Sequence, residues 1–246
     1  MKAKADLERV QMLAESWTPE QLLSWAFATY GDKVELATGM GVEGMVLTDI
    51  AWRINPALKV FTGDTEFLFS ETYDLMDRVE DKYGIRIERL YADLTPEEQE
   101  RKHGPRLWAS DPDQCCSIRK VEPLRRKLST LDAWVTAIRR SQTRERASVR
   151  KVDWDPKFNL IKISPLADWT REMVWNYVFQ HDVPYNPLHD QSFPSIGCTH
   201  CTRAIQPGED ARAGRWSGFG KTECGLHSPE PAAAQLVQLG TSAGDD

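Results

Sequence analysis

The sequence has no long apolar run, no excess of positive charge and few cysteines. No stretch approaches the roughly 18 to 20 apolar residues that a bilayer-spanning helix needs, and 31 basic against 37 acidic residues give a formal charge of −6. An acidic balance argues against a general binder of nucleic acid or of membrane surfaces. Met1 to Arg9 is charged throughout and lacks the apolar core of a secretory signal. We therefore expect a cytoplasmic protein with neither a nucleic-acid nor a membrane partner.

Internal repeats are absent as well. Hydrophobic residues make up 41% and charged residues 28% of the 246 positions, close to the averages of globular domains, which excludes a disordered or collagen-like chain. This length allows one α/β domain with an appendage or two small domains. Structural disulfides are rare in the cytoplasm, so the five cysteines are candidates for metal binding or catalysis.

Short apolar segments alternate with amphipathic segments along the first 181 residues. The pattern predicts strands at Val34 to Thr38, Leu58 to Thr62, Ile85 to Leu90, Ala133 to Ile138 and Asn159 to Ile163, and helices from Thr18 to about Tyr30, after Gly44, from Glu66 to Tyr83 and from Thr170 to His181. Strands that alternate with helices form a parallel twisted sheet flanked by helices, so we predict this α/β class. The many prolines and glycines after His181 predict an irregular C-terminal segment.

The cysteines fall into two close pairs and one isolated residue. Cys115 and Cys116 are adjacent, Cys198 and Cys201 form a CxxC pair, and Cys224 stands alone. Four thiolates in two pairs can hold either a structural zinc ion or an iron-sulfur cluster. Adjacent cysteine side chains diverge, which suits two irons of a cluster, whereas zinc sites favour CxxC-type pairs. The spacing alone leaves both centres open.

Positive charge is concentrated in one region of this acidic chain. Between Arg119 and Lys151 eleven basic residues oppose three acidic ones, a local net charge of +8. The region is either a solvated helix face with a loop or a pocket for a small polyanion. Gly39, Gly41 and Gly44 follow the first predicted strand, where backbone amides and a helix N-terminus can hold phosphate, although a plain strand-to-helix turn has the same pattern.

Cys224 lies in the segment Glu223-Cys224-Gly225-Leu226-His227, where a core cysteine is not expected. It is either an incidental surface thiol or a reactive one. Reactivity requires the thiolate, which a cationic pocket would favour. His227 is either an assisting group or a bystander.

Several of these segments resemble a known family. They are Cys115-Cys116-Ser117-Ile118-Arg119-Lys120-Val121-Glu122-Pro123-Leu124, Ser195-Ile196-Gly197-Cys198-Thr199-His200-Cys201-Thr202-Arg203, Gly214-Arg215-Trp216 and Lys221-Thr222-Glu223-Cys224-Gly225-Leu226-His227. Together they are similar to the assimilatory adenylyl-sulfate reductases, which are thioredoxin-dependent and contain an iron-sulfur cluster. The resemblance runs from about Val34 to His227, and the combination CC…CxxC…ECGLH is highly specific.

The resemblance implies an adenine-nucleotide α-hydrolase-like, Rossmann-like fold and the reduction of adenylyl sulfate to sulfite and AMP by thioredoxin or a similar dithiol protein, in sulfate assimilation toward cysteine. It implies a 4Fe-4S cluster on Cys115, Cys116, Cys198 and Cys201. Catalysis would use Cys224 as the nucleophile, with Lys120 near the cluster and the sulfate, and His227. The expected substrate contacts are Thr38, Gly39, Gly41, Asp64, Arg139, Arg140, Gln142, Arg215 and Trp216.

The same resemblance suggests how the chain is organised. We expect a single reductase domain over residues 1–230, with N-terminal helices at 1–30, a nucleotide-binding core at 31–181 and a cluster-completing, catalytic segment at 182–230. Residues 231–246 should form a disordered tail. We also expect a homo-oligomer.

Two positions depart from the family pattern, both in the nucleotide half. Gly44 follows Glu43 where relatives usually have Asp, and Glu66 stands where they commonly have Gly. An acidic Glu66 would disfavour an extra phosphate near the ribose, so we expect adenylyl sulfate to be preferred over its 3′-phosphorylated form.

Three other functions compete with this interpretation. The first is a phosphoadenylyl-sulfate reductase or a dual-substrate enzyme, a family in which both cysteine pairs are generally lacking. The second is an ATP-pyrophosphatase-type thiolation enzyme, whose SGGxxS-like loop this sequence does not have. The third is a zinc-stabilised binding module without activity, which leaves Cys224 and the basic region unexplained.

Overall fold

The sheet of this protein is mixed, with parallel strands and one antiparallel edge strand. The computed structural model describes residues 2–221, 223 and 225, with side chains from Asp6 onward. In this part of the chain six strands form one sheet in the order β3-β2-β1-β4-β6-β5. They are β1 (Val34–Thr38), β2 (Val60–Gly63), β3 (Ile87–Leu90), β4 (Ala133–Thr136), β5 (Val152–Asp155) and β6 (Leu160–Ile163).

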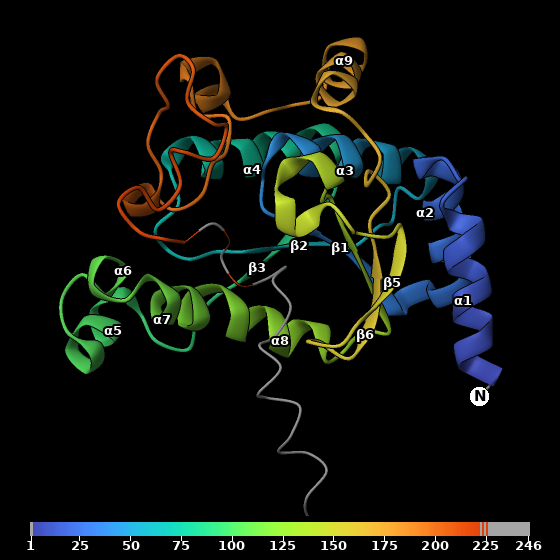
Figure 1. The fold of residues 1–246 in the computed structure, drawn as a ribbon, viewed down its shortest axis with the longest axis horizontal. Coiled ribbons are helices and arrows are strands. Elements are labelled where there is room, and N and C mark those ends of the chain that lie inside the picture. Colours follow the sequence, from blue (N-terminus) through green and yellow to red (C-terminus); the bar gives the residue numbers. More distant parts are fainter. Residues whose placement is uncertain (1, 222, 224, 226–246) are drawn as a thin grey trace, which may run out of the picture.

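Helices cover both faces of the sheet (Figure 1). One side carries α3 (Val42–Ile54), α4 (Ser70–Tyr83) and α9 (Arg171–His181), and the other carries α5 (Pro96–His103), α6 (Leu107–Ser110), α7 (Pro112–Cys116) and α8 (Glu122–Leu128). Helix α1 (Lys2–Ala14) lies beside β5, and α2 (Pro19–Tyr30) packs on α3. Short helical turns lie at Gly31–Lys33, Ser117–Val121, Arg140–Gln142, Arg144–Arg146, Pro187–Gln191 and Thr199–Cys201. None of the helices among the described residues is long and apolar enough to cross a membrane.

Side chains that point alternately to the two faces of the sheet form two apolar layers. On the side of α3 and α4 the sheet buries Leu36 and Val135. On the side of α8 it buries Phe61 and Trp134. Successive side chains of a strand point to opposite faces, so a strand of four or five apolar residues serves both layers. This requirement accounts for the apolar residues of β1, β2 and β4, and the carboxylate of Glu35, buried in β1, is paired with Lys127.

The prediction of an α/β fold is confirmed, with several local differences. Helices α5 to α8, which lie between β3 and β4 in the chain, were not predicted. Strand β5 was not expected, and it pairs with β6 antiparallel. Its charged and aromatic sequence, from Val152 to Asp155, did not give a strand-like apolar run. Helix α4 begins at Ser70 and not at Glu66, because Glu66 has a φ of 58° that interrupts helical geometry. Leu68 instead pairs with Cys198 in an isolated bridge.

Strand order reverses between β1 and β4. The chain moves outward from β1 through β2 to β3 and then returns to the opposite side of β1 as β4, and β1 is parallel to both neighbours. In open α/β sheets such a reversal leaves a crevice at the carboxyl ends of the strands, where ligands bind. The segments that follow β1 and β4 are therefore the first place to look for a site.

Asp49 holds α3, which follows β1, against two other helices. Its carboxylate accepts hydrogen bonds from Nε of Arg53 at 2.6 Å, from the Tyr83 hydroxyl of α4 at 3.0 Å and from the Tyr177 hydroxyl of α9 at 2.7 Å. Burial alone would raise the pKa of Asp49, but these hydrogen bonds outweigh it and hold the pKa below its ordinary value.

We expect Asp49→Ala to lower the free energy of unfolding by about 3 kcal/mol, because the buried hydroxyl of Tyr83 and the half-buried hydroxyl of Tyr177 lose their acceptor. Asp49→Asn should cost less, since an amide oxygen still accepts a hydrogen bond. Urea denaturation followed by circular dichroism measures both variants. Equal midpoints for the alanine variant and the wild type would contradict the role given to Asp49.

Candidate active site

Two cavities adjoin at the carboxyl ends of β1 and β4. The larger has a volume of about 470 Å³ and the smaller about 220 Å³. The residues that line both are Ala37, Gly39, Thr136, Arg146, Ile196, Arg212 and Arg215. The larger volume is typical of small-molecule sites. Three arginines on the shared wall suit an anionic ligand.

The glycine turn after β1 forms one edge of these cavities. Gly39 and Gly41 line the larger cavity, and the backbone N–H of Met40 donates to Oγ1 of Thr38 at 3.0 Å. A Cβ on Gly44 would overlap that Thr38 hydroxyl, so glycine is required where α3 approaches β1. At Gly41, the N-cap of α3, no side chain among the described residues caps the helix. Amides at this helix end therefore suit phosphate.

Arg139 and Arg140 follow β4 but take different places. Arg139 lines the larger cavity, and its Nε and Nη2 donate to Oε1 of Glu43 at 3.1 and 2.9 Å. Arg140 donates to Oε2 of Glu15 at 2.6 Å and to the Val149 carbonyl at 2.7 Å, and it is not among the lining residues. The expected substrate contact of Arg140 is thus not brought to either cavity.

The basic region divides between the cavities and the surface. Lys120, Arg139 and Arg146 line a cavity. Others form ion pairs elsewhere, namely Arg126 with Asp93, Lys127 with Glu35 and Glu88, Arg140 with Glu15 and Lys151 with Asp168. The basic region therefore contributes both to the cavity walls and to ion pairs elsewhere on the protein.

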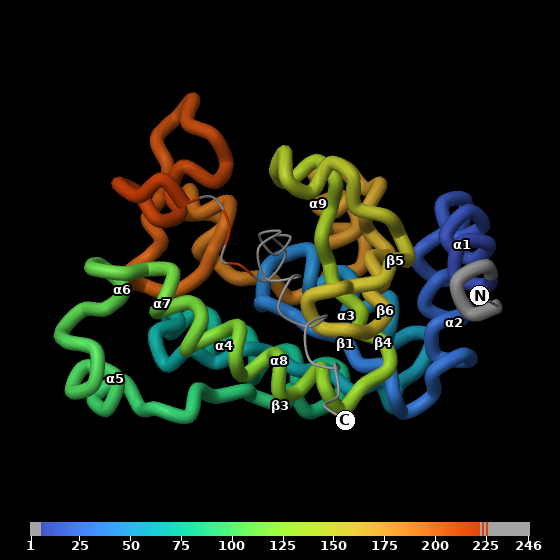
Figure 2. Tube along the Cα trace, turned by 60° about the horizontal axis from the view of Figure 1, so that its bottom comes forward, coloured from blue at the N-terminus to red at the C-terminus, as the bar shows by residue number. Residues whose placement is uncertain are grey.

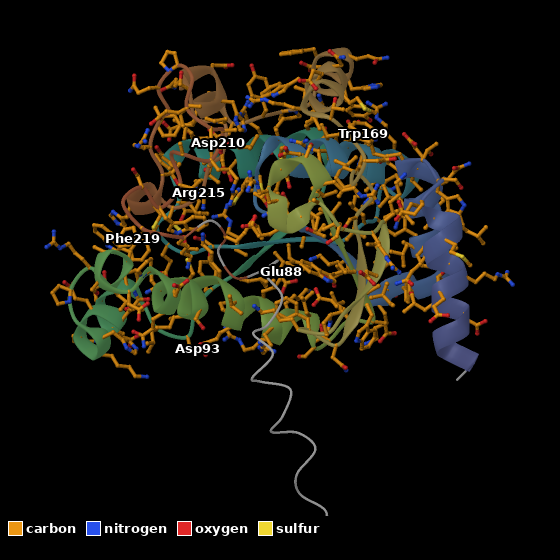
Figure 3. All side chains as sticks on the ribbon, in the orientation of Figure 1. Glu88, Asp93, Trp169, Asp210, Arg215 and Phe219 are labelled. Carbon is orange, nitrogen blue, oxygen red and sulfur yellow. The ribbon has the colours of Figure 1, made fainter. Side chains whose placement is uncertain are left out.

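The C-terminal segment folds back over the strand ends, as Figure 2 shows in orange and red. Thr202 pairs with Arg215 in an antiparallel bridge, and the Trp216 N–H donates to the Cys201 carbonyl at 3.1 Å. These contacts join the GRW element to the CxxC pair. Figure 3 labels Asp210, Arg215 and Phe219 along this segment.

Arg215 is packed tightly at the shared wall. Its Nη1 donates to Oγ of Ser195 at 3.2 Å, and its guanidinium lies 4.4 Å from the ring centre of Trp216. A Cβ on Gly197 would overlap the guanidinium, so a larger residue there would displace Arg215. Nε of Arg215 is buried and has no hydrogen-bond partner among the described residues. A buried donor of this kind is typical of a site that receives a ligand.

The two cysteine pairs converge on a third, small cavity. It is lined by Cys115, Cys116, Cys198 and Cys201, together with Phe67, Trp108, Pro112, Arg119, Lys120 and His200. These four cysteines are free thiols. Thr65 Oγ1 lies 3.3 Å from Sγ of Cys198, and the His200 ring stacks on Trp108 at 4.4 Å. Among the described residues, no three His, Cys, Asp or Glu side chains are arranged to hold one metal ion.

Charge around the thiols is uneven. Burial, together with the other three thiols, raises the pKa of Cys115 to about 11. Burial also acts to raise the pKa of Cys198, but the positive charge of Lys120, the Thr65 hydrogen bond and Arg215 outweigh it and lower that pKa. Lys120 lines both the cysteine cavity and the smaller of the two strand-end cavities. One ammonium group therefore faces both sites.

Arg119 is the most deeply buried cation beside the thiols, with 1% of its surface exposed. It donates to Oε1 of Gln99 at 2.8 Å and to Oε2 of Glu66 at 2.6 Å, while its Nη2 has no hydrogen-bond partner in the described part of the chain. The position of Glu66 corrects our expectation, because Glu66 lies against Arg119 on the cysteine side and lines neither strand-end cavity.

The other expected site residues are distributed as follows. Thr38 and Trp216 line the smaller cavity, and Gln142 lines the larger. Asp64 is buried, accepts a hydrogen bond from the Tyr73 hydroxyl at 2.8 Å and lines neither. Cys224 and His227 lie outside the described residues, as does the expected tail from 231 to 246.

Sequence reasoning did not single out Glu43, Arg146, Arg212 or Glu223 as site residues. Arg146 donates to both carboxylate oxygens of Glu223, 77 positions away, at 2.8 and 2.7 Å. Such long-range pairing leaves no local signal. Only the position of Glu223 inside the ECGLH segment could have indicated it.

Residues 33–204 match the phosphoadenosine phosphosulfate reductase domain family. The chain belongs to this family. It is 47% identical over 225 residues to the adenosine 5′-phosphosulfate reductase of Shouchella clausii, a match that covers 91% of this chain and 93% of that protein. It is 46% identical over 207 residues to adenosine 5′-phosphosulfate reductase 2 of Bacillus subtilis, covering 84% of this chain and 88% of that protein.

Solved structures agree with this membership. A phosphoadenylyl-sulfate reductase from Candida auris superposes with a TM-score of 0.72 at 29% identity, over 80% of this chain and 96% of that one. An FMN adenylyltransferase from Candida glabrata superposes with a TM-score of 0.54 at 15% identity, over 78% and 65%, a likeness of fold alone. The expected adenine-nucleotide α-hydrolase-like fold is confirmed.

Proposed function

We propose that the protein reduces adenylyl sulfate to sulfite and AMP, in the assimilation of sulfate toward cysteine. The observation that carries this proposal is Lys120, which faces both the four-cysteine cavity and the arginine-lined cavities at the strand ends. The names of the bacterial relatives support the same reaction. An ATP-pyrophosphatase-type enzyme would need the SGGxxS-like loop that this sequence lacks, and a binding module would leave Cys224 and the basic region unexplained.

Substrate binding would rest on fixed donors. Adenylyl sulfate carries a phosphate and a sulfate. Arg215, whose Nε has no hydrogen-bond partner among the described residues, lies on the wall common to both cavities, whereas the charge of Arg146 on that wall is offset by Glu223. The glycine turn and the α3 N-terminus add backbone amides. Negative charge develops on AMP as it leaves, and cations already in place stabilise it without reorganisation.

Chemistry would proceed through Cys224. Its thiolate attacks the sulfur of the substrate, the bond from sulfur to the bridging oxygen breaks, and AMP leaves with the electron pair, so an S-sulfocysteine remains. A thiolate of thioredoxin, or of a similar dithiol protein, then attacks the Cys224 sulfur and releases sulfite. The second thiol of the donor resolves the mixed disulfide, and the dithiol supplies both electrons. We assign His227 to the same segment as an assisting group. Such donors are kept reduced in the cytoplasm, where we place the reaction.

The four thiols fit a 4Fe-4S cluster better than zinc. A zinc ion takes its ligands at roughly 2.3 Å around one point, whereas the diverging side chains of adjacent residues such as Cys115 and Cys116 suit two irons of one cluster. The unpartnered Nη2 of Arg119 and the ammonium of Lys120 border the cavity, and a centre with four thiolates is anionic. Cys115, Cys116, Cys198 and Cys201 would hold the cluster, which when bound supplies negative charge beside Lys120.

Reduction of phosphoadenylyl sulfate remains the competing function, because the related protein from Candida auris is named a phosphoadenylyl-sulfate reductase. Glu43 provides a new reason to prefer the unphosphorylated substrate. It lines the larger cavity and neutralises Arg139, so this guanidinium is not available for an additional phosphate.

We expect kcat/KM for adenylyl sulfate to exceed that for its 3′-phosphorylated form by at least about tenfold, which is 1.4 kcal/mol. Glu43→Gln should shift the ratio toward the phosphorylated form by about threefold or more, because Arg139 loses its counter-ion. Glu66→Gln is the matched control, since Glu66 lines neither strand-end cavity, and it should leave the ratio unchanged. A wild-type ratio that favours the phosphorylated substrate would overturn the proposed substrate.

A further inference from the structure

Glu223 is a buried carboxylate that immediately precedes Cys224, with 7% of its surface exposed. It accepts hydrogen bonds from Nε and Nη2 of Arg146 at 2.8 and 2.7 Å. The Thr143 hydroxyl donates at 3.3 Å, and Nη2 of Arg212 lies 3.5 Å away. A two-pronged guanidinium–carboxylate contact sets both position and orientation, so Glu223 is fixed against the loop that contains Arg146.

This contact continues into the larger cavity. Nη1 of Arg146 donates to Oε1 of Gln142 at 2.5 Å, and the same oxygen accepts the Arg139 backbone N–H at 3.0 Å. Arg139 in turn holds Glu43 at the start of α3. A continuous set of polar contacts thus runs from the glycine turn to Glu223 along the cavity wall. Glu223 is therefore placed by the same groups that would place the substrate.

A second contact holds the other neighbour of Cys224. Nζ of Lys157, in the turn between β5 and β6, donates to the Gly225 carbonyl. Consecutive Cα atoms of a chain are about 3.8 Å apart. Cys224 lies outside the described residues, but it is bonded covalently to two residues that are each held by the fold.

We propose that Glu223 is a positioning residue for the Cys224 thiolate. Its carboxylate, held by Arg146, fixes the residue that directly precedes the nucleophile at the wall of the smaller cavity. A nucleophile confined near its target reacts far faster than one that must find it. The inference rests on the proposed function and on Cys224 as the nucleophile. It assigns no proton or electron transfer to Glu223.

The charge of Glu223 predicts a kinetic signature. Glu223 offsets positive charge at Arg146, so a neutral replacement leaves anion binding intact or strengthens it. The same replacement weakens the contact between Arg146 and residue 223, and it therefore slows attack by Cys224. A general loss of structure would instead weaken binding and chemistry together. The two effects are therefore separable.

The test measures single-turnover release of AMP from adenylyl sulfate without a dithiol donor, alongside the Kd for AMP. Glu223→Gln should slow AMP release by roughly 10- to 100-fold while the Kd for AMP stays within about threefold of wild type or falls. Glu223→Asp keeps the charge and should recover part of the rate. Glu209→Gln is the matched control, because Glu209 pairs with Arg203 through two contacts of 2.8 and 2.9 Å at the surface, and exposed pairs contribute little.

Unchanged AMP release in Glu223→Gln would overturn the role of Glu223, and so would a rise in Kd that matches the loss of rate. An equal loss of rate in Glu209→Gln would do the same. Wild-type protein that releases no AMP would overturn the proposed function and this inference with it, whereas active wild type with a normal Glu223 variant overturns the inference alone.

Discussion

Cys224→Ser is expected to reduce turnover of adenylyl sulfate to background while nucleotide binding and the cluster remain. A serine hydroxyl is almost wholly un-ionised at neutral pH, so it cannot attack sulfur at a useful rate or exchange with a thiol. The arginines that line the cavities and the four cysteines of the third cavity are other residues, and all of them remain in the variant. Titration with AMP and a visible spectrum of the variant check the two retained properties.

The same mechanism predicts a covalent product in the wild type. Incubation with adenylyl sulfate and no donor should release about one AMP per site and add a sulfonate to the peptide that contains Cys224. Peptide mass spectrometry locates the added group, and reduced thioredoxin should then release sulfite. If the added mass is found on another cysteine, or the serine variant still turns over, Cys224 is not the nucleophile.

Those elements of the fold that depend only on residues close together in the chain could be predicted from the sequence. Val34 to Thr38 is a strand with the predicted bounds, because a central parallel strand must be apolar on both faces. The helix predicted from Thr18 is α2, and it begins with a capping box between Thr18 and Gln21, a signal that needs only residues three apart. Strand β5 was missed because one edge strand of four residues, two of them aspartates, resembles a loop.

Placement of the charged side chains was harder to predict. Arg139 and Arg140 are adjacent, and backbone that is extended at Arg139 sends neighbouring side chains to opposite sides, so only Arg139 reaches the cavity. Glu66 lies on the cysteine side because its positive φ turns the chain there, which a sequence without glycine at that position did not indicate. Charge type was thus readable from the sequence, but the partner of each charge was not.

For the two cysteine pairs, the sequence suggested that they share one centre, but it did not show which contacts bring them together. Cys115 and Cys116 end a short helix on the α8 side of the sheet, whereas Cys198 and Cys201 belong to the C-terminal segment. They meet because Leu68 pairs with Cys198 and the Thr199 N–H donates to the Phe67 carbonyl at 2.8 Å. Spacing within each pair suggested a shared centre, and these backbone contacts are what brings the pairs to one cavity.

Replacement of Cys198 by serine should therefore remove the metal centre and not merely weaken it. Protein purified without oxygen should be brown and contain about four irons per chain, and Cys198→Ser should lose most of both. A serine oxygen is a poor ligand for iron that is otherwise held by thiolates. Activity should fall as well, because Lys120 would lose the anionic neighbour beside it.

Cys224→Ser is the matched control for this loss, since it also removes one thiol but leaves in place all four cysteines that line the cysteine cavity among the described residues. It should keep the iron and the colour of the wild type. Thr65→Val, which removes the hydroxyl 3.3 Å from Sγ of Cys198, should keep the iron too, because the ligand itself remains. Metal analysis distinguishes the cluster from a zinc site. A colourless wild type with one zinc per chain would show that the four cysteines hold zinc and not a cluster. Full iron content in Cys198→Ser would show that Cys198 is not a ligand, and the four-cysteine assignment would then fail.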